Sequence, residues 1–94
     1  MVKDLFNLDG KVAIVTGASR GLGQGMAIAL AQAGANIVGV GQSDMKSTKA
    51  EINKVGREFF EIKADLTTTE KVDEIVRKTV EEFGRVDILV NNAG

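Results

Sequence analysis

The chain has 94 residues and a formal net charge of −1, with charged residues of both signs spread along it. It contains no cysteine and no histidine, which excludes disulfides and the thiolate and imidazole ligands of most metal sites, so we expect no metal. The mixed charge argues against a nucleic-acid or anionic membrane surface, the apolar runs are too short to span a bilayer, and we expect a cytoplasmic protein.

In the first half of the chain, β-branched runs alternate with stretches of helical spacing. Strands are predicted at 11–15 and 35–40, and helices at 21–34 and 45–55. Gly34 and Gly56 stand where these helices are expected to end, because glycine readily adopts the left-handed backbone that closes a helix. Thr48 and Glu51 have the spacing of a capping box, which we expect near the start of the second helix.

The second half of the chain repeats this alternation. Strands are predicted at 58–64 and 86–90. Between them lies the clearest helix, whose apolar residues and one threonine form a single stripe that is expected to face a core: Val72, Ile75, Val76, Thr79, Val80 and Phe83. Thr67 and Glu70 have capping-box spacing before this helix, and Gly84 follows it as a candidate C-terminal cap.

The predicted element order is therefore β-α-β-α-β-α-β. Three of the four strands are nearly all apolar, as expected for parallel strands that helices cover on both faces. Right-handed crossovers then favour an α/β fold with a doubly wound parallel sheet of the Rossmann type. The fourth strand ends close to Gly94, so we expect residues 1–94 to be the N-terminal part of a single Rossmann-fold domain.

The segment TGASRGLGQG, residues 16–25, joins the first strand to the first helix. Its glycines would let a phosphate approach the free N–H groups that begin a helix. Spacing excludes a P-loop, because Gly-Lys-Ser/Thr is absent, and it does not match G-x-G-x-x-G. Two patterns fit. One is T-G-x-x-x-G-x-G, at Thr16, Gly17, Gly21 and Gly23. The other is G-x-G-x-G, as in methyltransferases that bind S-adenosylmethionine, and a turn without any ligand is a third possibility.

A second motif, NNAG, follows the fourth predicted strand at residues 91–94. Open α/β sheets bind their ligands at the carboxyl ends of the strands. An asparagine after a buried strand is costly unless it is hydrogen-bonded, so we expect Asn91 to fasten a neighbouring strand. The small residues Ala93 and Gly94 would let a flat ligand lie against the backbone.

Together, T-G-x-x-x-G-x-G after the first strand and N-N-A-G after the fourth resemble the short-chain dehydrogenase/reductase family over all 94 residues. This resemblance implies NAD or NADP and disfavours S-adenosylmethionine. It also implies that the pyrophosphate and adenosine ribose are surrounded by Gly17, Ser19, Arg20, Gly21, Leu22 and Gly23. Asp65 matches the position that contacts the adenine, with the Leu66 backbone beside it, although Asp65 would equally suit the start of a helix. The two riboses are expected to contact Asn92, Ala93 and Gly94.

The end of the second strand usually selects between NAD and NADP. A carboxylate there accepts the ribose 2′-OH of NAD, whereas a basic side chain suits the 2′-phosphate of NADP. Gly41 stands where the carboxylate is expected, and Asp44 lies too far into the loop. Gln42 and Ser43 are the candidate ribose contacts between them. Arg20 occupies a position that the family associates with NADP, and it equally suits a solvated side chain.

One subgroup is matched more closely, through LF-L-GKVA before the loop and GLGQGMA within it, including Gln24 and Met26. That subgroup oxidises the sugar acids 2-deoxy-D-gluconate or 2-dehydro-3-deoxy-D-gluconate, usually with NAD. The resemblance thus implies a dehydrogenase that interconverts a secondary alcohol and a ketone on a small molecule, as a homo-oligomer (tetramer or dimer). A 3-oxoacyl-carrier-protein reductase shares GKVAIVTGASRGLG equally well, and a non-catalytic dinucleotide-binding module is a further alternative.

No catalytic residue is assigned within these 94 residues. The family uses a Ser, a Tyr and a Lys, and the chain contains no tyrosine at all. The resemblance implies that this catalytic set lies beyond Gly94, so the chain is expected to carry part of a cofactor site and no catalytic centre.

Overall fold

The structure is a computed structural model that describes residues 7–64 and 70–92. In chain order the elements are β1 (Val12–Thr16), α2 (Gly21–Gln32), β2 (Asn36–Gly41), α3 (Lys46–Lys54), β3 (Phe59–Lys63), α4 (Glu70–Phe83) and β4 (Ile88–Val90). The predicted order of elements is confirmed, and each strand lies within two residues of its predicted bounds. Within the described ranges, no helix is long and apolar enough to cross a membrane.

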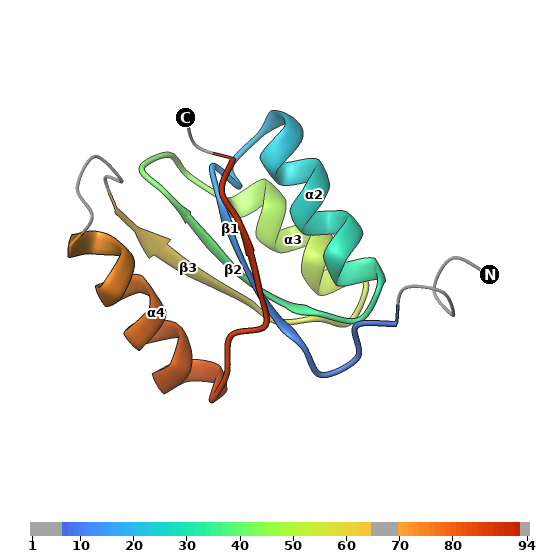
Figure 1. The fold of residues 1–94 in the computed structure, drawn as a ribbon. Helices are drawn as coiled ribbons and strands as arrows, with labels where there is room; N and C mark the ends of the chain where they lie inside the picture. Colours follow the sequence, from blue (N-terminus) through green and yellow to red (C-terminus); the bar gives the residue numbers. More distant parts are fainter. Residues whose placement is uncertain (1–6, 65–69, 93–94) are drawn as a thin grey trace.

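The four strands form one parallel sheet in the order β3-β2-β1-β4. The chain moves outward from β1 through β2 to β3, then crosses back to place β4 on the other side of β1 (Figure 1). This reversal of direction at β1 is the point at which open α/β sheets leave a crevice between their loops. The predicted doubly wound parallel sheet is confirmed, and the glycine loop and Asn92 both lie at this reversal point.

Helices cover the sheet on both faces: α2 and α3 lie on one side, and α4 lies on the other (Figure 1). The side chains of the strands alternate between two cores, as the pleat requires. The core under α2 and α3 contains Ala13, Val15, Ala27, Ala31, Ile37, Ile52 and Phe59. The core under α4 contains Val12, Ile14, Val38, Val40, Ile62 and Ile75.

Helix ends agree only in part with the sequence expectations. Gly34, Gly56 and Gly84 have φ of +116°, +80° and +82°, so each closes a helix in the left-handed region as predicted. The capping box at Thr48 is wrong: α3 begins at Lys46 after Met45, with no side-chain cap, and Thr48 lies inside the first turn. The capping box predicted at Thr67 falls outside the described residues.

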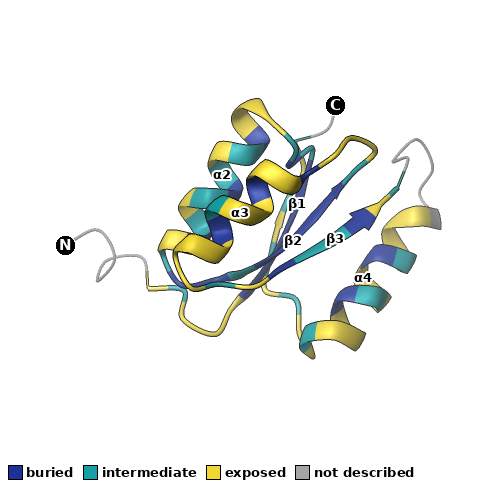
Figure 2. Cartoon of the chain, turned by 180° about the vertical axis from the view of Figure 1, so that it is seen from behind, coloured by how far each residue is buried: buried dark blue, intermediate teal, exposed yellow. Residues whose placement is uncertain are grey.

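The apolar stripe of α4 is only partly buried. Ile75 and Thr79 are buried against the sheet, but Val72, Val76 and Val80 are 45%, 37% and 45% exposed. The expectation that the whole stripe faces a core is therefore wrong for these three valines. The physical reason is that α4 lies toward β2 and β3 (Figure 2). On the same face of the sheet, Leu89 of β4 is itself 57% exposed.

Candidate functional site

The loop between β1 and α2 is shaped by two glycines with positive φ. Gly17 has φ of +68° and Gly21 has φ of +61°, conformations that side chains with a Cβ rarely adopt. No side chain caps the start of α2, and its first turn contains no acidic residue. A Cβ at Gly21 would meet nothing within 4 Å, so no neighbouring group packs against Gly21 on that side. An anion therefore fits at the start of α2.

Gly23 allows the glycine loop to approach the end of β4. A Cβ at this position would lie far inside contact distance of the Gly17 carbonyl oxygen and 2.7 Å from Asn92 Nδ2. Only glycine leaves room for both neighbours. The two motifs found in the sequence, separated by about 70 positions, are thus in contact in the folded chain.

Thr16 ties the ends of β1 and β4 together at the same place. The backbone N–H of Asn92 donates to Thr16 Oγ1 at 2.8 Å. The Thr16 hydroxyl lies 3.3 Å from both Val90 O and Asn91 Oδ1. Asn91 is therefore hydrogen-bonded to the neighbouring strand, as expected of an asparagine that follows a sheet strand.

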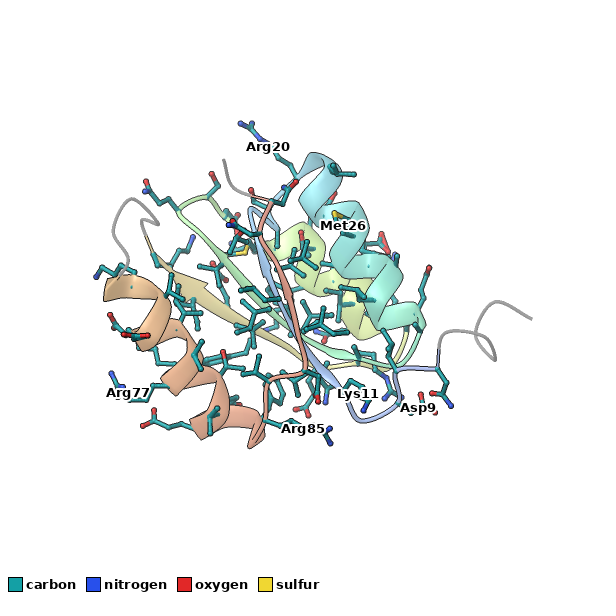
Figure 3. All side chains as sticks on the ribbon, viewed as in Figure 1. Asp9, Lys11, Arg20, Met26, Arg77 and Arg85 are labelled. Carbon is teal, nitrogen blue, oxygen red and sulfur yellow. The ribbon has the colours of Figure 1, made fainter. Side chains whose placement is uncertain are left out.

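The described candidate residues gather at the carboxyl ends of β1, β2 and β4. Of the glycine loop and first turn of α2, Gly23 is buried, Ser19 and Gly17 are half-buried, and the others are exposed: Arg20, Gly21 and Leu22. Arg20 extends into solvent beside the start of α2 (Figure 3). Gln42 and Ser43 are exposed after β2, and Asn92 is half-buried. Asp65, Leu66, Ala93 and Gly94 lie outside the described residues.

A cation at the end of β3, Lys63, contacts the loop after β2, and the sequence analysis did not predict it. Lys63 pairs in register with Gly41 across β2 and β3, and its Nζ donates to the Ser43 carbonyl oxygen at 3.1 Å. The same ammonium lies 3.1 Å from Glu61 Oε2. A Cβ at Gly41 would meet nothing within 4 Å, so a side chain fits there. The sequence did contain a signal for this cation, because Lys63 stands at the end of the strand that was predicted to follow the second helix.

A bidentate ion pair, Arg85 with Asp87, lies away from this loop cluster. Hydrogen bonds from Arg85 and from the Val12 N–H hold the pKa of Asp87 below its usual range. This pair stands where β4 begins, and Arg20 and Arg85 mark opposite ends of the sheet (Figure 3). It belongs to the scaffold. Among the described residues, no cluster of three carboxylates could hold a metal ion.

A model of the short-chain dehydrogenase family matches residues 11–94. The chain belongs to this family. The resemblance seen in the two motifs is thus confirmed over nearly the whole chain, and the sheet with its glycine loop is that of a short-chain dehydrogenase.

Relatives with curated names match the chain over its length. A 2-dehydro-3-deoxy-D-gluconate 5-dehydrogenase of Dickeya dadantii is 51% identical over 94 residues, and one of Escherichia coli is 47% identical over 94 residues. The chain spans 37% of the length of each. A 3-oxoacyl-[acyl-carrier-protein] reductase of Vibrio cholerae is 42% identical over 88 residues, which are 94% of this chain and 36% of that protein.

Solved structures of short-chain dehydrogenases share the fold. A hydroxysteroid dehydrogenase of Escherichia coli superposes with a TM-score of 0.88 at 37% identity, covering 98% of this chain and 40% of that one. A carveol dehydrogenase of Mycobacterium avium in complex with NAD gives a TM-score of 0.83 at 30% identity, over 94% of this chain and 37% of that one. These similarities agree with the Rossmann-type sheet described above.

Proposed function

We propose that the full-length protein is an NAD(P)-dependent oxidoreductase that interconverts a secondary alcohol and a ketone on a sugar acid. The observation that carries the proposal is the contact between the glycine loop and Asn92, which Gly23 alone makes possible. The substrate class, 2-dehydro-3-deoxy-D-gluconate or 2-deoxy-D-gluconate, rests on the names of the two relatives at 51% and 47% identity.

The geometry of the loop cluster suits a dinucleotide. The pyrophosphate would lie against the first N–H groups of α2, near Gly17, Ser19, Arg20, Gly21, Leu22 and Gly23. The adenosine ribose would contact Gln42 and Ser43. The adenine would contact Asp65 and the Leu66 backbone, and the two riboses would contact Asn92, Ala93 and Gly94. When bound, the nicotinamide would accept or donate the hydride. The described residues of this chain bind and orient the cofactor.

Between the two cofactors we propose a modest preference for NAD, as in the subgroup that the sequence resembles. The ammonium of Lys63 is paired with the carboxylate of Glu61, which weakens its attraction for the 2′-phosphate of NADP. Arg20 is exposed and would favour NADP. Gly41 leaves space for a side chain but supplies no acceptor to the ribose 2′-OH, so we expect discrimination to be weak.

Gly41→Asp tests this placement of the ribose. The new carboxylate would accept the 2′-OH of NAD and repel a 2′-phosphate, so the ratio of NAD to NADP affinity is expected to rise at least about tenfold. Gly41→Asn is the matched control, since it adds similar bulk without the charge. An unchanged ratio in Gly41→Asp would place the ribose elsewhere.

The remaining parts of the proposal concern the complete protein. Residues 1–94 would form the N-terminal part of one Rossmann domain, with the catalytic Ser, Tyr and Lys further along the polypeptide. We also propose a homo-oligomer, a tetramer or dimer, located in the cytoplasm. Size-exclusion chromatography with light scattering and cell fractionation test these two statements.

The second candidate is a 3-oxoacyl-carrier-protein reductase, which the 42% identity to the Vibrio cholerae enzyme supports. The deciding experiment follows NADH and NADPH absorbance with the full-length protein and three substrates: 2-dehydro-3-deoxy-D-gluconate, 2-deoxy-D-gluconate and a 3-oxoacyl thioester. Turnover of a sugar acid is expected. Turnover of the thioester alone would favour the reductase, and cofactor binding without any turnover would indicate a non-catalytic module.

A further inference from the structure

A buried hydroxyl connects the glycine loop to α3. Thr48 is fully buried, and its Oγ1 donates to the Ala18 carbonyl oxygen at 2.7 Å. Gln24, in the first turns of α2, donates from Nε2 to the same Thr48 Oγ1 at 2.9 Å. The Thr48 hydroxyl therefore acts as donor and acceptor at once, between two segments that are 24 and 30 positions away in the chain.

These bonds are not part of helix capping. Thr48 lies inside the first turn of α3, and its hydroxyl turns away from its own helix toward the glycine loop. Gln24 Nε2 also lies 3.3 Å from Ser47 Oγ and 3.5 Å from the Ser19 carbonyl oxygen. The side-chain amide of Gln24 is thus placed between the loop and the start of α3.

The segment immediately before α3 is fixed by its own contacts. Met45 is fully buried, and the Lys46 N–H donates to Asp44 Oδ1 at 2.9 Å. Residues 42–45, here called the ribose loop, are therefore held against the first turn of α3. A bond from Thr48 to Ala18 then fixes the ribose loop relative to the glycine loop, residues 17–20.

We propose that Thr48 and Gln24 are positioning residues for the adenosine half of the dinucleotide. They hold the glycine loop and the ribose loop at the separation that the ligand spans between its pyrophosphate and its adenosine ribose. The inference rests on the proposed function, because it needs a dinucleotide at this site. Neither residue is assigned a contact with the cofactor.

The physical argument is preorganisation. A dinucleotide links its ribose and pyrophosphate covalently, so both loops must be at the right distance when it binds. Loops that are free to move lose that freedom on binding, which lowers affinity without removing any contact to the ligand. Breaking the Thr48 hydrogen bonds is therefore expected to lower the affinity for adenosine-containing ligands and to leave the rate of the chemical step unchanged.

Thr48→Val is the principal variant, since valine keeps the β-branched shape and removes the hydroxyl. Thr48→Ser keeps the hydroxyl and is expected to retain near-normal affinity. Thr79→Val is the matched control: Thr79 is also fully buried, and its hydroxyl donates to the Ile75 carbonyl oxygen at 2.8 Å within α4, on the other face of the sheet. Any general effect of losing a buried hydroxyl will appear in Thr79→Val as well.

The experiment measures dissociation constants of the full-length protein for NAD, NADP and ADP-ribose by calorimetry, together with kcat and the KM values in turnover. In Thr48→Val we expect the dissociation constants of all three ligands to rise about tenfold, with kcat and the KM of the sugar acid within about twofold. Gln24→Leu should raise them about threefold, and the double variant should resemble Thr48→Val because both changes break one network.

Each other outcome is decisive. Affinity in Thr48→Val equal to that of Thr79→Val, or failure of Thr48→Ser to retain affinity, would overturn the inference. If Thr48→Val does not fold, Gln24→Leu decides, and unchanged cofactor affinity in it overturns the inference. Failure of the unaltered protein to bind any of the three ligands would instead refute the proposed function, and the inference with it.

Discussion

At the scale of single residues, two glycines of one helix differ in the space available for a side chain. Gly23 faces the Gly17 carbonyl and the Asn92 amide, whereas a Cβ at Gly25 would meet nothing within 4 Å. Both lie in α2, and neither has positive φ. The sequence places them in the same glycine-rich run, but only the fold distinguishes a glycine that contacts β4 from one that faces solvent.

Gly23→Ala is expected to cost about 1–3 kcal/mol of unfolding free energy, because the new methyl group forces the loop away from Asn92. The same displacement should weaken dinucleotide binding more than tenfold. Gly25→Ala is the matched control and is expected to stabilise the protein by about 0.5–1 kcal/mol, since alanine favours a helix over glycine. Denaturant titration and calorimetry measure both. Equal effects of the two variants would contradict this account of Gly23.

At the scale of elements, the start of β4 is fastened to β1 by a carboxylate. Asp87 Oδ2 accepts from the Val12 N–H at 2.8 Å, and the Asp87 N–H donates to Val12 O at 2.9 Å. Arg85 donates to both carboxylate oxygens from Nε and Nη2, each at 2.8 Å. This arrangement sets the register that pairs Ala13 with Ile88.

Asp87→Asn tests this junction through pH. The folded pKa of Asp87 lies below its ordinary value, chiefly because of the Arg85 hydrogen bond and then that of the Val12 N–H. The ionised Asp87 therefore stabilises the folded protein when the pH is above the ordinary pKa of about 4, and this stabilisation is lost as the pH falls through the lower pKa of the folded state. We expect Asp87→Asn to be less stable than the unaltered protein at pH 7, with the difference shrinking below about pH 4.

The measurement is urea unfolding between pH 7 and pH 2.5. Asp73→Asn removes an exposed carboxylate on α4 and serves as the control. A difference between Asp87→Asn and the unaltered protein that stays constant with pH would show that the charge of Asp87 has no part in the junction.

The sequence predicted the elements well because each has a local signal: β-branched runs, helical spacing and closing glycines. The capping box at Thr48 failed because α3 begins earlier, at Lys46, and the hydroxyl oxygen that would accept a capping hydrogen bond accepts one from the distant Gln24 side chain instead. Such competition depends on tertiary contacts and has no local signature. The two glycine- and asparagine-containing motifs are also local, so the sequence predicted most of the candidate site. The contact of Lys63 with the loop after β2 could not be predicted in this way, because it depends on the pairing of β2 with β3.

At the scale of the whole molecule, one face is apolar and uncovered. Val72 and Val76 of α4 and Leu89 of β4 line a groove of about 160 Å³, together with Ile14, Thr16, Ile75 and Asn91. Val80 of α4 is also exposed, at 45%. Contiguous apolar surface of this kind is usually covered by other protein. The α2 and α3 face of the sheet has no comparable exposure among the described strand residues.

A polypeptide of residues 1–94 is therefore expected to self-associate and to bind an apolar dye. Val76→Lys should reduce both, while changing the unfolding free energy by about 1 kcal/mol or less, because Val76 is 37% exposed and a lysine can keep its stem on the apolar surface with its ammonium in water. Val55→Lys is the control, since Val55 is 38% exposed against 37% for Val76 but follows α3 on the other face. Sedimentation and dye fluorescence give the result. Equal reductions in both variants would argue against a specific apolar face.

The bond from Asn92 to Thr16 joins positions 76 apart, nearly the ends of the described chain. During synthesis the glycine loop emerges before β4 and before the asparagine against which it packs. Contacts so distant in sequence form slowly, because the intervening chain must be ordered first. A ribosome-bound chain halted before residue 88 would lack β4 altogether. The capacity to hold a nucleotide is therefore expected to arise only once β4 has emerged and paired with β1.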